Sequence, residues 1–307
     1  MGGAFVAVAN DSSATWWNPA GLAAGPFFDM AIARNAGVQD ERLPAARSGA
    51  WSFSVGTPPF GLSYYRLRLT EIRAADPTAQ DLANREDRRA GVDVRSLSVS
   101  QFGATILHTV LTGVHVGTTV KYVRATPRAA FVAAAADIPA LLDRGGDLEG
   151  GDAEGAFDLD VGVLAVFGGI RVGAVVRHLR EPGFDLPAAA ADVEPMRLPR
   201  QVRVGAAFDA DAAGLLPLTV SLDADVDAYA TGSGERRVVA LGAEHWLLSR
   251  RLGVRGGARF NTVGARDEAV TGGLSVSLRP GTYVDAHVVA GGDGGEEGWG
   301  VAARVSF

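Results

Sequence analysis

The sequence predicts an all-β protein, a transmembrane antiparallel β-barrel of about fourteen strands. Three observations support this: apolar and polar residues alternate along most of the chain, long and short connections follow one another in turn, and 40 of the 307 residues are glycine. Alternation with a period of two is the pattern of β-strands. The longest apolar runs are far shorter than the roughly 18 residues that a transmembrane helix needs. If this chain crosses a membrane, it is therefore expected to do so with strands.

Composition excludes several other classes of protein. The chain has no cysteine, which excludes a disulfide scaffold, thiolate metal sites and a cysteine nucleophile. Its formal net charge of −6 and its lack of basic runs argue against nucleic acid as a partner. Lys121 is the only lysine, so nearly all basic residues are arginine. This arginine bias is attributed to a GC-rich genome and not to function.

Each of the clearest strands has one apolar face and one charged or glycine-containing face. The alternation is cleanest in residues 202–209, 218–227 and 252–261. Around Gln101 and Phe102 the phase of the alternation slips, as a β-bulge would make it. The expected strands begin near Phe27, Ala50, Phe60, Val92, Val114, Phe157, Ile170, Leu198, Leu218, Arg236, Leu252, Glu268, Tyr283 and Gly298.

The order of the connections favours an outer-membrane barrel. Long connections, such as residues 36–47, 71–91, 127–154 and 179–197, alternate with short ones, such as residues 57–59 and 168–169. Outer-membrane barrels have short periplasmic turns and longer outer loops, and an even number of strands places both termini in the periplasm. The predicted location is the bacterial outer membrane, with both termini periplasmic. A short helix is expected at Ala129–Arg144 in the longest outer loop, either as a lid or as loop packing.

The charged faces of the strands are expected to line the lumen, because an arginine facing lipid near the midplane costs about 2–4 kcal/mol. Calcium binding at Asp223, Asp225 and Asp227 is less favoured than ion pairs with arginines across the lumen. The five histidines are scattered, and no nucleophile or phosphate-binding motif is present. No metal, cofactor or enzymatic activity is therefore expected. The predicted lumen-facing charges are Arg203, Asp223, Asp225, Glu244, Arg255 and Arg259.

Glycine recurs at the positions expected to face inward. Gly117, Gly162, Gly173, Gly205, Gly253 and Gly257 all occupy the polar phase of their strands. Small residues there suit a crowded, plugged or narrow interior. The last strand, residues 299–307, also alternates and ends on Phe307, which is similar to the C-terminal signal of bacterial outer-membrane barrels.

The N-terminal segment carries a family resemblance. A small-residue stretch from Gly2 leads to Trp16-Trp17-Asn18-Pro19-Ala20-Gly21-Leu22, and this pattern resembles the start of FadL-type outer-membrane transporters and the related PorV-like proteins. Residues 198–207 and 241–244 resemble PorV-family strands. The resemblance implies a fourteen-stranded barrel, residues 26–307, and a hatch, residues 1–25, that enters it from the periplasmic side. Because family members carry a signal peptide and further residues before the Gly-Gly pair, Met1 is expected to be a truncated start, an internally assigned start or the start of a processed chain.

The expected hatch and gating residues are Trp16, Trp17, Asn18, Pro19, Ala20 and Gly21. The two tryptophans would gate a hydrophobic pore or, as we favour, anchor the plug against the wall. Asn18 and Pro19 are expected to form a rigid turn in which the Asn18 side chain caps backbone groups.

Two functions follow from this resemblance. The first is a FadL-like barrel that passes hydrophobic small molecules across the outer membrane. The second is a PorV-like accessory barrel that docks secreted or surface proteins as part of a larger outer-membrane complex. The expected partners are membrane lipid together with a hydrophobic small molecule or a secreted or surface protein.

Overall fold

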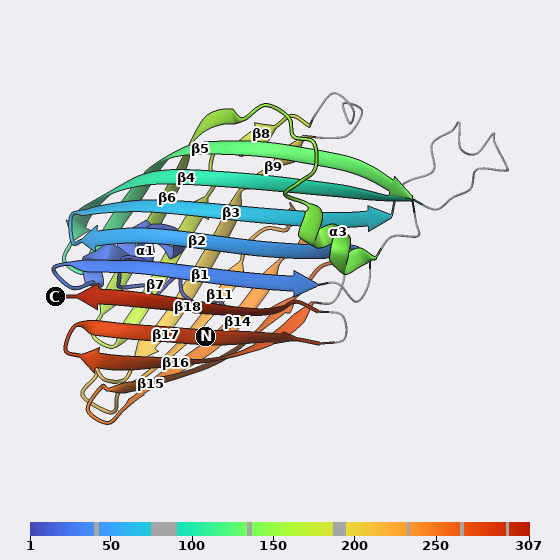
Figure 1. Ribbon diagram of the computed structural model, residues 1–307. Helices are drawn as coiled ribbons and strands as arrows, with labels where there is room; N and C mark the ends of the chain where they lie inside the picture. Colours follow the sequence, from blue (N-terminus) through green and yellow to red (C-terminus); the bar gives the residue numbers. More distant parts are fainter. Residues whose placement is uncertain are drawn as a thin grey trace.

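The computed structural model describes residues 1–39, 43–74, 91–133, 137–186, 195–231, 234–264, 267–292 and 295–307. Within them, fourteen antiparallel strands close into one barrel, in which each strand pairs with its predecessor and β1 pairs with β18 (Figure 1). The predicted fold class, a closed antiparallel barrel, is confirmed. No helix of the described residues is long and apolar enough to cross a membrane.

The elements have the following bounds. The barrel strands are β1 (Asp29–Gln39), β2 (Ala45–Thr57), β3 (Phe60–Ala74), β4 (Gly91–Leu111), β5 (Val114–Ala133), β6 (Glu154–Phe167), β7 (Ile170–Arg177), β10 (Gln201–Asp209), β11 (Leu218–Asp225), β14 (Val238–Leu247), β15 (Leu252–Asn261), β16 (Glu268–Arg279), β17 (Thr282–Gly291) and β18 (Glu297–Ser306). Two small ribbons pair β8 (Gly183–Phe184) with β9 (Met196–Arg197), and β12 (Tyr229–Thr231) with β13 (Gly234–Arg236). The helices are α1 (Ala14–Trp17), the 3-10 helix η1 (Pro19–Ala24) and α3 (Ile138–Arg144).

The two ends of the barrel differ. One end, which we call the turn end, holds the short connections 58–59, 112–113 and 168–169 and lies near Phe307, whose carbonyl accepts a hydrogen bond from the N–H of Phe28. The opposite end is called the loop end. There β3, β4 and β5, with 15, 21 and 20 residues, extend past the other strands (Figure 1).

Several expected boundaries were wrong at the loop end. Residues 129–133, expected as helix, continue β5, and α3 forms only from Ile138. The expected loop 36–47 is shorter, because β1 runs to Gln39 and β2 begins at Ala45. In each case the strand continues beyond the point where its apolar alternation ends, since backbone pairing with a neighbouring strand does not require that pattern.

The bulge expected near Gln101 and Phe102 was also wrong. Strand β4 pairs there with β3 and β5 without interruption, and its register shift lies between Thr109 and Leu111. The alternation of apolar residues changes phase here for another reason: both faces of β4 change polarity at this point. Toward the turn end the outer face is apolar and the inner face polar, and toward the loop end Leu97 and Val99 make the inner face apolar.

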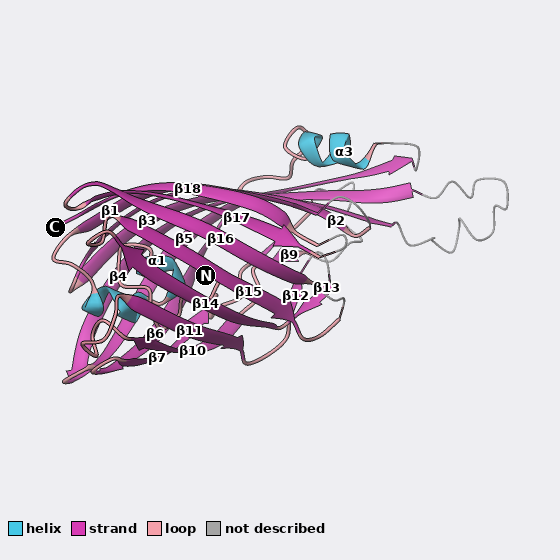
Figure 2. Ribbon diagram, turned by 90° about the horizontal axis from the view of Figure 1, so that it is seen from below, coloured by secondary structure: helices cyan, strands magenta, loops and turns pink. Residues whose placement is uncertain are grey.

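Helix α3 covers the outer face of the extended strands (Figure 2). Ile72 and Val94 share the strand face of the exposed Phe60 and Leu62, yet both are fully buried. They form an apolar cluster with Leu142 of α3. The helix therefore removes from solvent the apolar outer-face side chains that lie past the ends of the shorter strands.

Candidate functional site

The N-terminal segment, residues 1–25, occupies the lumen near the turn end. Figure 2 shows α1 within the ring of strands. Ala4, Ala14, Asn18 and Ala20 are each 0% exposed, although the segment has few large apolar side chains with which to bury itself. Its burial therefore depends on the barrel wall that surrounds it.

A row of inward-facing glycines forms the surface on which this segment lies. We call this row the glycine seat, and its members are Gly117, Gly162, Gly173, Gly205, Gly242 and Gly257 on β5, β6, β7, β10, β14 and β15. A Cβ on Gly173 would lie 2.7 Å from the Val6 carbonyl oxygen, and one on Gly242 would lie 2.6 Å from the Met1 Cβ. Only glycine allows the segment's backbone to approach the wall so closely.

Polar side chains between the glycines bind the backbone of the segment. The Asp223 carboxylate accepts hydrogen bonds from the N–H groups of Phe5 and Val6, at 2.7 and 2.9 Å. The Ser221 hydroxyl donates to the Ala4 carbonyl at 2.9 Å. Because buried backbone groups need partners, these contacts take the place of a strand ladder for the segment.

The Asn18 side chain forms hydrogen bonds both within the N-terminal segment and with the barrel wall. Its Nδ2 donates to the carbonyl oxygens of Val6, at 2.9 Å, and Val163, at 3.0 Å. Its Oδ1 accepts from the Ala20 N–H at 3.1 Å, so the side chain caps η1. Pro19 follows at the first position of η1, where its fixed φ and missing N–H cost nothing.

The remaining residues of the predicted hatch motif also lie in this region. A Cβ on Gly21 would overlap the Ala9 carbonyl, so Gly21 lets η1 approach the preceding chain. Trp17 stacks on Phe5 within the segment, with ring centroids 5.1 Å apart. Trp16 contacts Tyr65 of β3, with ring centroids 5.0 Å apart, and the Arg177 guanidinium lies over its ring. In this arrangement Trp16 contacts the wall and Trp17 contacts the segment itself.

The predicted lumen charges lie on inner faces and are engaged in ion pairs or hydrogen bonds. Arg203 pairs with Asp225 at 2.6 Å, and Asp223 binds the N-terminal backbone instead of an arginine. Arg255 pairs with Glu244 and with Asp285. Arg259 pairs with Glu296 at 2.5 Å. The second Asp225 oxygen accepts from the Val238 N–H, so this carboxylate has no free oxygen for a cation.

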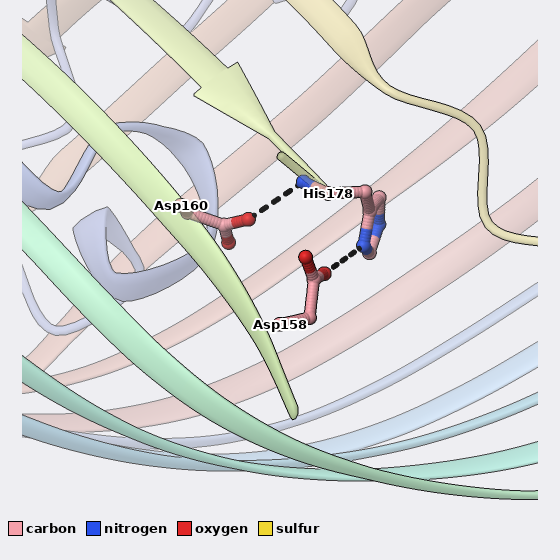
Figure 3. A group of neighbouring side chains, drawn as sticks. All are labelled: Asp158, Asp160 and His178. Atoms are coloured by element: carbon pink, nitrogen blue, oxygen red, sulfur yellow. Dashed lines mark hydrogen bonds and ion pairs between the residues drawn. The ribbon is translucent and has the colours of Figure 1, made fainter. Parts of the chain in front are cut away.

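A second cluster of charges lies on the loop-end side of the glycine seat, and Figure 3 shows its acidic and imidazole groups. The Lys121 Nζ lies 2.6 Å from Asp160 Oδ1 and 3.0 Å from Asp158 Oδ2. The His178 Nδ1 lies 2.8 Å from Asp158 Oδ2, and the His178 N–H donates to Asp160 Oδ1 at 2.9 Å. Burial lowers the pKa of His178 below its ordinary value, which favours the neutral ring.

This cluster has the ligand types of a metal site. Asp158, Asp160 and His178 each offer one atom, and these atoms lie within 4.8 Å of one another. The Lys121 ammonium, however, already lies within hydrogen-bonding distance of both carboxylates and supplies the positive charge that a metal would bring. The geometry is therefore that of a buried ion-pair cluster.

Sequence analysis missed this cluster. Its signal was Lys121 itself, the one lysine of an arginine-rich chain, placed on an inner face opposite Asp158. His178 follows β7 in a connection, and only the fold brings it beside these residues.

Still nearer the loop end, the lumen contains an apolar cluster. Leu97 and Val99 of β4 and Val123 and Ala125 of β5 surround Phe184, which is 0% exposed. Phe184 belongs to the β8–β9 ribbon and enters the lumen from a connection between strands. The slip in alternation near Gln101 obscured this cluster, because it was interpreted as a bulge and not as a change in the polarity of the inner face.

At the turn end a cavity of about 270 Å³ lies between the N-terminal segment and the wall. Phe5 and Val8 of the segment and Trp246 and Tyr283 of the wall supply its apolar lining. Ion-paired side chains complete it, among them Arg304 with Asp11. The cavity therefore combines apolar surface with neutralised charges.

Comparison with known proteins identifies a family and a fold. Residues 29–225 match the sequence family described as F plasmid transfer operon, TraF, protein. No curated protein matches the chain. Among solved structures, the CymD monoaromatic hydrocarbon channel is 12% identical with a TM-score of 0.65, over 98% of this chain and 94% of that one. A Pseudomonas aeruginosa FadL homologue is 11% identical with a TM-score of 0.65, over 99% and 96%. The Pseudomonas putida toluene transporter TodX is 11% identical with a TM-score of 0.55, over 100% and 97%.

Proposed function

This chain belongs to the family of F plasmid transfer operon TraF proteins and has the fold of FadL-type outer-membrane channels, and from this fold we propose that it passes hydrophobic small molecules across the bacterial outer membrane. The observation that carries the proposal is the apolar cluster around Phe184 inside the lumen. A lumen lined only by charges would exclude such molecules, because an apolar solute does not repay the desolvation of polar groups. Leu97, Val99 and Val123 pack against Phe184 and are at most 4% exposed, so they line a path for such a molecule only when the β8–β9 ribbon moves away from them.

In this proposal, residues 1–25 are a hatch that closes the barrel, residues 26–307. Hydrogen bonds, close packing and the ion pair of Asp11 with Arg304 hold the segment, and we infer that it moves as a unit. Both termini would lie in the periplasm, with the turn end facing the same way. A molecule released past the hatch would leave through the cavity beside Phe5 and Trp246.

A reversible lock tests whether the hatch moves. A Cβ on Gly56 of β2 would lie 3.6 Å from the Ser12 Cβ, which is within the range of a disulfide. The chain has no native cysteine, so the double variant Ser12→Cys/Gly56→Cys can form only this intended pair within one chain. The assay is uptake of a radiolabelled hydrophobic solute such as toluene into proteoliposomes, with and without reductant.

We expect the oxidised double variant to lose most uptake and to regain it after reduction. The single variants Ser12→Cys and Gly56→Cys are the matched controls and should respond to neither treatment. Uptake that is equal in the oxidised and reduced forms would contradict a moving hatch. Uptake no faster than in protein-free vesicles, for every variant in both states, would contradict transport itself.

A second function is favoured by a different observation. Strands β4 and β5, with 21 and 20 residues, are about twice as long as the 9–11 residues that span a membrane. The excess builds a wall, covered by α3, that a secreted or surface protein could contact. If the barrel is such an accessory subunit, the cysteine lock leaves its activity unchanged, and substitutions on the outer face of α3 weaken assembly of the complex instead.

A further inference from the structure

The outer face of strands β2–β6 carries a complete row of aromatic side chains. Cross-strand pairing aligns them in the order Phe53, Tyr64, Phe102, Tyr122 and Phe157. The ring centroids of Tyr122 and Phe157 are 5.4 Å apart. Residues one step toward the turn end, such as Leu62 and Val120, are apolar and exposed. In membrane barrels, aromatic girdles mark the level of the membrane–water interface.

One step toward the loop end, the same outer face becomes basic. Arg66 of β3 pairs with Trp51 of β2 and Ser100 of β4, and Ser100 pairs in turn with Arg124 of β5. Arg34 of β1 lies in the same row, since it also pairs with Trp51. Three further arginines continue the surface toward the loop end. We call this set the arginine belt, and its members are Arg34, Arg47, Arg66, Arg68, Arg124 and Arg128.

Most of the belt has no internal counter-charge. Arg47 pairs with Asp143 of α3, and Arg128 donates a hydrogen bond to the Ser98 hydroxyl. Among the described residues, the other four arginines form no ion pair, and all four are exposed. The outward positions between them on β3, β4 and β5 hold serine and threonine. Arg34, Arg66, Arg68 and Arg124 are therefore four exposed positive charges without an ion-pair partner in the described part of a chain whose formal net charge is −6.

The belt is confined to one side of the barrel. On β10, β11, β14 and β15 the outward positions include Val204, Leu222, Leu241 and Val254, and none of these four strands carries an outward arginine. Arginine richness of the whole chain does not produce such an uneven distribution.

We propose that the arginine belt binds the phosphate groups of anionic lipids in the leaflet at the loop end. Two features favour lipid as the partner: the belt adjoins the aromatic row on the outer face, and four of its six arginines are exposed there. If the aromatic row marks the interface, the belt lies beside the head groups. The planar guanidinium matches phosphate oxygens with two parallel hydrogen bonds. Basic residues near a membrane surface are attracted to anionic head groups. With the termini in the periplasm, as proposed above, this leaflet is the outer one.

The test measures lipid selectivity at the protein surface. The full chain is reconstituted in phosphatidylcholine bilayers that contain trace spin-labelled phosphatidylglycerol or spin-labelled phosphatidylcholine, and electron paramagnetic resonance reports the motionally restricted fraction of each. The triple variant Arg66→Gln/Arg68→Gln/Arg124→Gln removes three exposed belt charges. The control Arg180→Gln/Arg200→Gln/Arg251→Gln removes three exposed charges that lie in connections away from the belt. Heat-modifiable migration on a gel verifies that each variant is folded.

We expect the native chain and the control to bind phosphatidylglycerol about twofold or more in preference to phosphatidylcholine, and the belt variant to lose that preference. Raising the salt concentration to about 0.5 M should reduce the preference for phosphatidylglycerol, because salt screens the attraction between exposed charges. A native chain without selectivity, or a control that loses as much as the belt variant, would overturn the proposal.

Discussion

The lumen is filled in two different ways along its length. At the turn end the glycine seat accepts the backbone of a separate segment, and single side chains such as Asp223 bind its N–H groups. Toward the loop end, side chains of the wall and of the connection after β7 fill the space, with Lys121 between Asp158 and Asp160 and with Phe184 in an apolar cluster. This difference bears on the proposed hatch, because the proposal requires the segment at the seat to move and the Lys121 cluster to stay in place. The segment at the seat carries few buried charges of its own. Separating Lys121 from Asp158 and Asp160, in contrast, would leave buried charges without their partners, which costs free energy.

The largest expected effect is at this fixed part. Lys121→Met removes the ammonium that neutralises two carboxylates and leaves them buried without their counter-charge. Removing one partner of a buried pair costs about 3–5 kcal/mol of unfolding free energy. Arg124→Met on the same strand is the matched control, because Arg124 is exposed and forms no ion pair among the described residues, so its cost should be within about 0.5 kcal/mol. Urea unfolding in neutral detergent micelles measures both. An equal loss of unfolding free energy in the two variants would show that the Lys121 ion pairs do not stabilise this part of the barrel.

Sequence reasoning anticipated the glycine seat better than the Lys121 cluster, for a physical reason. Inward glycines such as Gly162 and Gly205 follow the strand period, so alternation alone indicated a crowded interior. Only the family resemblance around Asn18 indicated that the N-terminal segment fills this interior. The cluster depends on His178, which lies in a connection without any periodicity.

The polarity change along β4 was hidden for a related reason. A strand that leaves the membrane exchanges its apolar and polar faces without any change in backbone pairing. In the sequence, this exchange around Gln101 has the same appearance as a bulge. Cross-strand pairing resolves the two, because the aromatic row and the arginines beyond it align across several strands.

At the glycine seat, the expected effect is intermediate. A Cβ at Gly162 would overlap the Asn18 side-chain oxygen and lie 2.9 Å from Pro19 Cδ, so Gly162→Ala displaces the turn that holds the segment. Overpacking of this kind costs about 1–3 kcal/mol. Gly256→Ala is the control, since nothing lies within 4 Å of a Cβ at that outward position. Limited proteolysis should cleave residues 1–25 faster in Gly162→Ala only, while the barrel remains heat-modifiable. A segment that stays equally protected in both variants would mean that the seat is not a close fit.

The smallest effect is a pH dependence at the fixed part. Burial lowers the pKa of His178 in the folded protein, so the unfolded chain binds the proton more readily. The stability that comes from the neutral ring is fully present above the unfolded value of about 6.5 and is lost as the pH falls from there toward the folded pKa. The loss is at most about 1.4 kcal/mol per pH unit for one group.

The unfolding midpoint in urea should therefore fall between pH 7.5 and 5.5 in the native chain and fall less in His178→Gln, which cannot take up the proton. Within the residues that the structure describes, the hydrogen bonds of His178 to side chains and its ion pair join it to Lys121, Asp158 and Asp160 and not to residues 1–25, so protection of that segment from protease should change equally in both proteins over this range. If instead the native segment alone became accessible at low pH, the two parts of the lumen would be coupled, and the separation into a fixed and a movable part would fail.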